Sequence, residues 1–179
     1  MNHCDTCHRQ LAFGATISVI GRGSYSYACY NASLAAESGV WFDNAELAPV
    51  ILRDALDHPH TFRIHSRLAL GAGHVMEAIE DGAEGFGYQF KVMGPEESDA
   101  LVLFSELYAK MRRGLDTRYL SEDRLGLQLV EQDFLEGRIE MDRGSDGPVL
   151  VVDGRPRSWE EIGRLLLTYE GWNISFEII

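Results

Sequence analysis

Hydrophobic and polar residues alternate with the period of a β-strand over three segments in the middle of the chain. These segments are residues 61–70, 74–81 and 86–94, and glycine-containing turns separate them. In the first segment Phe62 and Ile64 fall on one face, while charged residues fall on the other. The pattern predicts an antiparallel sheet with one face in contact with solvent.

Helical periodicity is strongest between Pro95 and Gly114, where apolar residues recur at steps of three and four. Proline at the start and acidic residues in the first turn favour a helix N-terminus there. A second principal helix is predicted to begin at Ser158, which forms a capping box with Glu161, and to end at Gly171.

Strand patterns recur after the first principal helix. They cover residues 127–134, 137–143 and 148–153, with a glycine-containing turn before the last of these. The closing run of the chain, residues 172–179, alternates again and predicts a terminal strand. The C-terminal third is therefore predicted to combine several strands with one helix.

The first 60 residues have a different pattern. Residues 11–20 and 24–28 flank a glycine-rich turn and predict a β-hairpin, and residues 29–37 predict a short helix that Gly39 caps. Residues 50–56 predict another short helix, within a proline-containing connector.

The elements do not follow the βαβ alternation of a doubly wound parallel sheet. We therefore predict an α+β fold, a mostly antiparallel sheet with two principal helices, preceded by a small treble-clef-like finger. The predicted domains are the finger at residues 1–39, a connector at residues 40–60 and a core domain at residues 61–179. A chain of 179 residues is long enough for one such core with a small satellite.

The candidate metal ligands are three cysteines near the N-terminus. Cys4 and Cys7 form a C-x2-C pair, and Cys29 lies at the start of the predicted short helix. Knuckle, hairpin and helix N-terminus are the layout of a treble-clef zinc finger, whose second ligand pair is also C-x2-C. Here the position three residues before Cys29 is Ser26, a poor zinc ligand. We predict zinc held by the three cysteines and His8, or a degenerate finger that has lost its metal.

Other interpretations of these cysteines stay open. His3 is a second candidate for the fourth ligand. The run from Cys4 to His8 also matches the C-x-x-C-H pattern of covalent haem attachment, although no export signal precedes it. A thioredoxin-like redox pair needs a βαβ context, and no strand or helix precedes residue 4.

The chain is strongly acidic, with 28 Asp and Glu residues against 16 Lys and Arg residues and a formal net charge of −12. Such a field repels phosphate backbones, so direct binding of nucleic acid is disfavoured. No apolar run approaches the roughly 20 residues that a membrane-spanning helix requires, and the N-terminus has no signal-peptide pattern. We therefore expect a cytoplasmic protein with reduced cysteines.

Outside the finger, few residues carry candidate chemistry. Arg63, His65 and Arg67 project from one face of a predicted strand, where they could bind a phosphate or a carboxylate. Pairing with acids on neighbouring strands, such as Glu77, is the competing interpretation. Glu170 lies at a helix end, where the helix dipole disfavours a carboxylate. The chain contains no Walker loop and no G-x-G-x-x-G, H-E-x-x-H or G-x-S-x-G motif.

The C-terminal region resembles a family of uncharacterised bacterial proteins. The segments that carry the resemblance are HTFRIHSRLALGAGH and VLVVDGRPRSWEEIGRLLLTYEGWNISFEI. Members of the family end in a pattern DG-x-x-x-(S/T)-W-E-E…TYEG, often after a cysteine finger. The resemblance covers the last two-thirds of the chain and implies no assigned activity. The chain departs from it at Ser26, where relatives with an intact finger would carry a second C-x2-C pair.

The sequence favours a non-catalytic binding or regulatory module that recognises a protein partner, with the finger as a structural or docking element. The reason is that no catalytic constellation is visible. One alternative is a small hydrolase or nucleotide-processing enzyme, in which Arg63, His65 and Arg67 converge with an acid such as Glu170 in one pocket. Another is an acidic mimic of nucleic acid, which requires carboxylates along one surface stripe.

Overall fold

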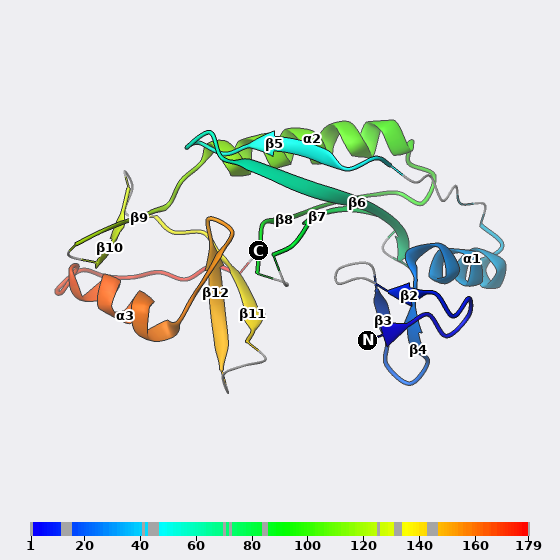
Figure 1. Ribbon diagram of the computed structural model, residues 1–179, viewed down its shortest axis with the longest axis horizontal. Coiled ribbons are helices and arrows are strands. Elements are labelled where there is room, and N and C mark those ends of the chain that lie inside the picture. The colour runs from blue at the N-terminus through cyan, green and yellow to red at the C-terminus, as the bar shows by residue number, and fades with distance from the viewer. Residues whose placement is uncertain are drawn as a thin grey trace. The chain divides into compact units, whose positions relative to one another are not determined.

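The structure is a computed structural model of the chain (Figure 1). It describes residues 2–11, 16–40, 42, 47–69, 71, 73–83, 86–124, 126–130, 134–142 and 147–178. In this part of the chain, three helices accompany strands that all pair antiparallel, which confirms the predicted α+β class. None of the helices in the described ranges combines the length and the hydropathy needed to cross a membrane.

The chain forms two compact units, Met1–Thr117 and Arg118–Ile179. This division differs from the predicted domains at residues 1–39, 40–60 and 61–179. The predicted connector contributes a strand to the sheet of the first unit, and the division between the units falls inside the predicted core domain.

The first unit is built on a four-stranded antiparallel sheet (Figure 1). Its strands, in spatial order, are β5 (Val50–Arg53), β6 (Pro59–Ala69), β7 (Gly73–Glu80) and β8 (Gln89–Gly94). The last three confirm the strands predicted from the alternating pattern. Phe62 and Ile64 are buried, as predicted, while Arg63 on the opposite face is exposed.

The helix predicted at residues 50–56 is wrong. Residues 50–53 form β5, which pairs with the first part of β6 from Val50 opposite Phe62 to Arg53 opposite Pro59. Short apolar runs are ambiguous between helix and strand, and here the available edge of β6 decides in favour of the strand.

The first principal helix, α2 (Ala100–Asp116), covers one face of this sheet (Figure 1). Asp99 caps it, because its carboxylate accepts hydrogen bonds from the backbone N–H groups of Leu101 at 2.7 Å and Val102 at 3.3 Å. The core between helix and sheet consists of Leu52, Phe62, Ile64, Met76, Ala78, Leu103, Leu107, Met111 and Leu115. Burial of these side chains is the main stabilising contribution to the unit.

The cysteine finger precedes the sheet in the same unit. Its elements are β1 (Asn2–His3), β2 (Gln10–Leu11), β3 (Ile17–Val19), β4 (Gly23–Tyr25) and α1 (Tyr27–Ser38). β1 pairs with β2 and β3 pairs with β4, so the predicted hairpin is present, although residues 12–15 of its predicted first strand lie outside the described residues. Gly39 ends α1 in the left-handed conformation with φ 70°, as predicted.

The second unit contains a hairpin, a three-stranded sheet and one helix. These elements are β9 (Leu120–Asp123), β10 (Gly126–Leu129), β11 (Arg138–Met141), β12 (Pro148–Val152), β13 (Arg155–Arg157) and α3 (Trp159–Leu167). Leu120, Val152 and Leu165 form its buried cluster. The predicted capping box is present, with Ser158 and Glu161 exchanging hydrogen bonds at the start of α3.

Two sequence predictions for this unit need correction. The second principal helix ends at Leu167 and continues as turns up to Gly171, because the backbone N–H groups of Thr168 and Tyr169 bond carbonyls three residues back. Residues 172–178 were predicted as a terminal strand, but they belong to none of the sheets in the described part of the chain.

Candidate metal centre

The knuckle that carries Cys4 and Cys7 is a turn between β1 and β2. The backbone N–H of Cys4 donates to the carbonyl of Arg9 at 2.9 Å, and the N–H of His8 donates to the carbonyl of Cys4 at 2.8 Å. His8 closes the turn with φ 57°. The fold of the turn therefore places both cysteines on one short loop whose backbone is fixed by its own hydrogen bonds.

A second contact joins the knuckle to β4. Asp5 donates its backbone N–H to the carbonyl of Ser24 at 2.9 Å, and its carboxylate accepts the N–H of Ser24 at 2.7 Å. The neighbouring Gly23 permits this approach, because a Cβ there would lie 2.1 Å from the carboxylate oxygen Oδ2. The two hairpins of the finger are thus held together next to the cysteines.

Cys29 lies in the first turn of α1. The helix is capped by Ser26, whose hydroxyl oxygen accepts the backbone N–H of Cys29 at 3.3 Å. The carbonyl of Ser26 also accepts the N–H of Tyr30 at 2.9 Å. Ser26, which occupies the position of the missing fourth cysteine, therefore has a defined role as a helix cap.

The sulfur atoms of Cys4, Cys7 and Cys29 all lie within 4.8 Å of one another. Two sulfurs on one tetrahedral zinc ion lie about 3.8 Å apart at the usual Zn–S length, so the three side chains fit a metal site. Cys4 is buried, Cys29 is half-buried and Cys7 is exposed, and all three are free thiols. This confirms that the three cysteines converge into a finger-like site.

The predicted histidine ligands are not part of this group. In the described part of the chain, the group of side chains placed to hold a metal consists of the three cysteines. His8 and His3 are both exposed and belong to no such group. The assignment of His8 as fourth ligand therefore stays a prediction.

The electrostatics of the site favour one thiolate even without a metal. Burial raises the pKa of the Cys4 thiol, but hydrogen bonds from the backbone N–H groups of Cys7, Ser26 and Thr6 lower it by more, to about 6. For Cys29 the Ser26 hydroxyl lowers the pKa, while burial and hydrogen bonds with Cys7 and Cys4 raise it by more, so its pKa lies above the ordinary value. Negative charge at the site is thus concentrated on Cys4.

The finger is attached to the sheet through α1. Tyr27, the first residue of α1, stacks on His65 of β6 with ring centroids 4.4 Å apart, and its hydroxyl donates to Glu77 Oε2 at 3.2 Å. Burial raises the pKa of Tyr27 and lowers that of His65, so both rings are held in their neutral forms at neutral pH. Tyr27 lies two positions before Cys29, so the metal site and the sheet contact share one helical turn.

The three residues of the predicted anion patch have partners within the first unit. Arg63 pairs with Asp81 at 2.9 Å and Arg67 pairs with Glu77 at 3.1 Å, while His65 carries the Tyr27 ring. The carboxylates offset the charge that would attract an anion. Glu77 is the partner that the competing interpretation named, and anion binding at these residues stays a prediction.

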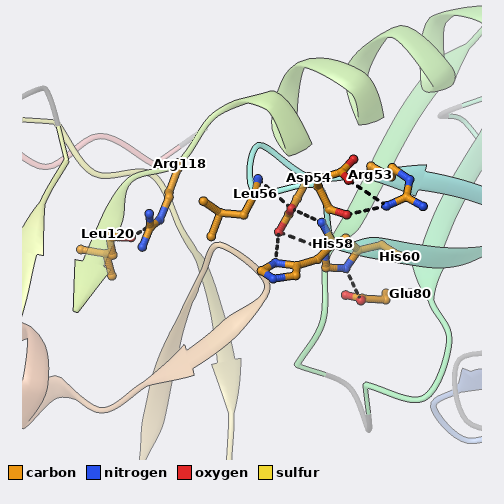
Figure 2. Close-up of polar contacts among 9 residues, drawn as sticks. Arg53, Asp54, Leu56, His58, His60, Glu80, Arg118 and Leu120 are labelled. Carbon is orange, nitrogen blue, oxygen red and sulfur yellow. Dashed lines mark hydrogen bonds and ion pairs between the residues drawn. The ribbon is translucent and has the colours of Figure 1, made fainter. Parts of the chain in front are cut away.

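A second polar cluster joins the turn after β5 to the start of β6 (Figure 2). Asp54 Oδ1 accepts the backbone N–H groups of Leu56 at 2.9 Å and His58 at 2.8 Å. Its other oxygen, Oδ2, lies 3.3 Å from His58 Nδ1 and 3.3 Å from His60 Nε2. His60 Nδ1 in turn lies 2.6 Å from Glu80 Oε1 on β7.

The pattern of the sequence did not predict this cluster, and His58 and His60 lie at the end of the predicted connector, residues 40–60. The spacing of Asp54, His58 and His60 around one turn was visible in the sequence. The partner Glu80 was not, because it depends on the register that places Phe62 opposite Glu80. The hydrogen bonds, together with the two histidines, lower the pKa of Asp54 to about 2 although burial raises it. The cluster holds the β5–β6 turn to the sheet.

The boundary between the two structural units coincides with the boundary between two matches to known protein families. Residues 43–116 match the family model described as domain of unknown function DUF7686, and residues 119–179 match the one described as domain of unknown function DUF7713. No curated protein and no solved structure matches the chain. The resemblance to an uncharacterised family is thereby confirmed. The chain therefore combines a cysteine finger with two segments that are similar to the domains of unknown function DUF7686 and DUF7713.

Proposed function

We propose that the protein is a non-catalytic protein-binding module whose N-terminal finger holds a structural zinc ion. The zinc assignment is carried by the convergence of three cysteine sulfurs within 4.8 Å from the knuckle and from α1. Thiolates are soft ligands that favour zinc, and the three thiols are free to coordinate it.

Zinc at this place would fasten α1 to the knuckle. The same helix contacts the sheet through Tyr27 and Asn31, so the ion would stabilise the docking of the finger on β6. Metal binding of this kind is coupled to folding, because the unfolded chain does not hold the three sulfurs together. The metal therefore has a structural role in the proposal, and the finger is part of the first unit.

The protein-binding part of the proposal is supported by the C-terminal residues. Trp172, Ile174, Phe176 and Ile178 are exposed by 70%, 57%, 75% and 92%. An apolar residue at every second position is the pattern of a strand with one apolar face. A segment with this pattern that joins no described sheet fits a partner protein that offers a free strand edge beside an apolar surface.

The two alternative functions, a small enzyme and an acidic mimic of nucleic acid, receive less support. The enzyme hypothesis needs cationic groups available to a substrate, and Arg63 and Arg67 are engaged with carboxylates. The acidic mimic needs an unbroken stripe of carboxylates, whereas ion pairs with acids mix both signs over the surface. The arginines in such pairs are Arg22, Arg53, Arg63, Arg67, Arg112, Arg138, Arg157 and Arg164.

Elemental analysis of the protein refolded with zinc tests the metal. We expect about one zinc per chain, and loss of the zinc in Cys4→Ser and Cys29→Ser. Ser33→Ala, on the exposed side of α1, is the control and should keep the metal. A zinc content near zero in the refolded wild-type protein would end the zinc proposal.

Substitutions on the two faces of the C-terminal segment test partner binding. Phe176→Ser with Ile178→Ser should abolish recovery of a protein that co-purifies with the wild-type chain, while Asn173→Ala with Ser175→Ala should not. Circular dichroism must show the same fold for both variants. Equal recovery with both variants would contradict the proposal, as would unfolding of the second unit by the first variant alone, since the segment would then belong to the core of that unit.

A further inference from the structure

We infer that the metal in the finger keeps one coordination position for a thiolate from outside the finger. The inference rests on the proposed zinc site and adds the chemical class of the fourth ligand of the metal. Zinc in structural sites is four-coordinate, and the finger provides three sulfurs, from Cys4, Cys7 and Cys29. Whether the fourth ligand comes from the finger or from outside depends on the polar side chains near these sulfurs.

Ser26 is occupied as a helix cap. Its oxygen accepts the N–H of Cys29 at 3.3 Å, and its hydroxyl donates to the sulfur of Cys29. A neutral hydroxyl with both functions in use is a weak competitor for zinc. A cysteine at this position would complete a four-thiolate site but would cap the helix poorly, since serine is among the preferred N-cap residues.

The histidines next to the knuckle do not reach the group either. His8 and His3 are exposed and outside the cluster that the three cysteines form. Cys7, by contrast, is itself exposed, so the site opens to solvent on its side. A ligand from solution can approach the metal there without any rearrangement of the buried Cys4.

The charge of the site determines which ligand and which chemistry fit. Three thiolates around a divalent ion leave a net negative charge, so a bound water is acidified less than on three neutral imidazoles. Hydrolytic chemistry is therefore disfavoured. A soft thiolate suits the metal better, and when it binds, the water leaves and the thiol proton passes to solvent. A small free thiol and a cysteine side chain of a partner protein offer the same chemistry.

Cobalt(II) in place of zinc makes the coordination visible by absorbance. We would titrate the Co(II)-loaded full chain with 2-mercaptoethanol, with a short cysteine peptide and with the serine version of that peptide. We expect a saturable shift of the wild-type spectrum with both thiols and none with the serine peptide. A response to 2-mercaptoethanol alone would identify a small thiol as the ligand, and a stronger response to the peptide would identify a protein cysteine.

Three variants separate the candidate fourth ligands. Ser26→Cys should bind Co(II) at least about 10-fold more tightly and should not respond to thiols, because its own sulfur fills the position. Ser26→Gly keeps a residue that is accepted at a helix N-cap, and it should still bind Co(II) and respond to thiols, because the hydroxyl is not a metal ligand. His8→Asn keeps a residue that tolerates positive φ and should leave the thiol-free spectrum unchanged.

The outcomes distinguish this inference from the zinc proposal. Absence of Co(II) and zinc binding would overturn both. Normal Co(II) binding without a thiol response would overturn the inference alone. A thiol response that appears only after Ser26→Gly or His8→Asn would also overturn it, because it would identify an internal fourth ligand.

Discussion

The backbone N–H of Leu68 donates a hydrogen bond to the side-chain oxygen of Asn31 at 3.0 Å. The amide nitrogen of Asn31 donates to the carbonyl of Ser66 at 2.8 Å. β5 pairs with β6 only as far as Phe62, so these two backbone groups lie beyond the end of the neighbouring strand. The side chain of one helical residue therefore replaces a strand at this edge and ties the finger to the sheet.

Asn31→Leu should destabilise the first unit by about 3 kcal/mol, because the buried N–H of Leu68 and the partly buried carbonyl of Ser66 both lose their partner. The free energy of unfolding in urea measures the effect. Ser33→Ala on the exposed side of α1 should change it by less than about 0.5 kcal/mol. Equal effects of the two substitutions would show that the amide of Asn31 is dispensable.

Gly23→Ala should disrupt the finger more than Gly21→Ala. Both glycines have positive φ, so both substitutions strain the backbone. Only at Gly23 does the added Cβ meet another group, 2.1 Å from Asp5 Oδ2, whereas nothing lies within 4 Å at Gly21. The zinc content and the thermal midpoint of each variant measure the difference. Loss of zinc in Gly21→Ala alone would contradict the packing argument.

Gly114→Ala and Gly163→Ala should have opposite effects although both glycines are helical. Alanine normally stabilises a helix by up to about 1 kcal/mol relative to glycine, which is the expected gain at Gly163, where nothing lies within 4 Å. At Gly114 the Cβ would lie 2.4 Å from the ring of Phe90, so we expect a loss of about 1 to 2 kcal/mol. Denaturation in urea measures the free energy of unfolding of each variant. A higher free energy of unfolding in Gly114→Ala would disprove the close contact of α2 with β8.

Asp54→Asn should remove part of the acid sensitivity of the first unit. The pKa of Asp54 is about 2 in the folded protein, below its ordinary value of 3.8. The folded state therefore binds a proton at Asp54 less readily than the unfolded state does. The ionised Asp54 stabilises the folded state fully above pH 3.8, and this stabilisation is lost as the pH falls towards 2. At pH 6 the substitution should cost about 2 kcal/mol.

The control for this prediction is Asp57→Asn, whose carboxylate is exposed and pairs with Arg53 at 3.2 Å. Exposed ion pairs contribute less than about 1 kcal/mol. Unfolding measured between pH 6 and pH 3 should show the difference between wild type and Asp54→Asn becoming smaller on acidification. If the difference in free energy of unfolding stayed constant with pH, the contribution of the Asp54 hydrogen bonds would not depend on the charge of the carboxylate.

The amino-acid sequence by itself determined the local features of this protein. The period of two in residues 61–70 gave the buried positions of β6, because the side-chain alternation of a strand is a local property. Ser158 and Glu161 identified the start of α3, since a capping box involves groups three residues apart. The spacing of Cys4, Cys7 and Cys29 predicted their convergence, because knuckle and helix start are local structures with known geometry.

Tertiary structure decided which distant residues meet. The register of β6 and β7 brings Glu80 to His60, and the free edge of β6 receives Asn31. Pairing with that same β6 turns residues 50–53 into a strand against their helical pattern. None of these relationships follows from local periodicity, because each depends on pairing between segments far apart in the chain, and a shift of one residue in register would exchange every partner.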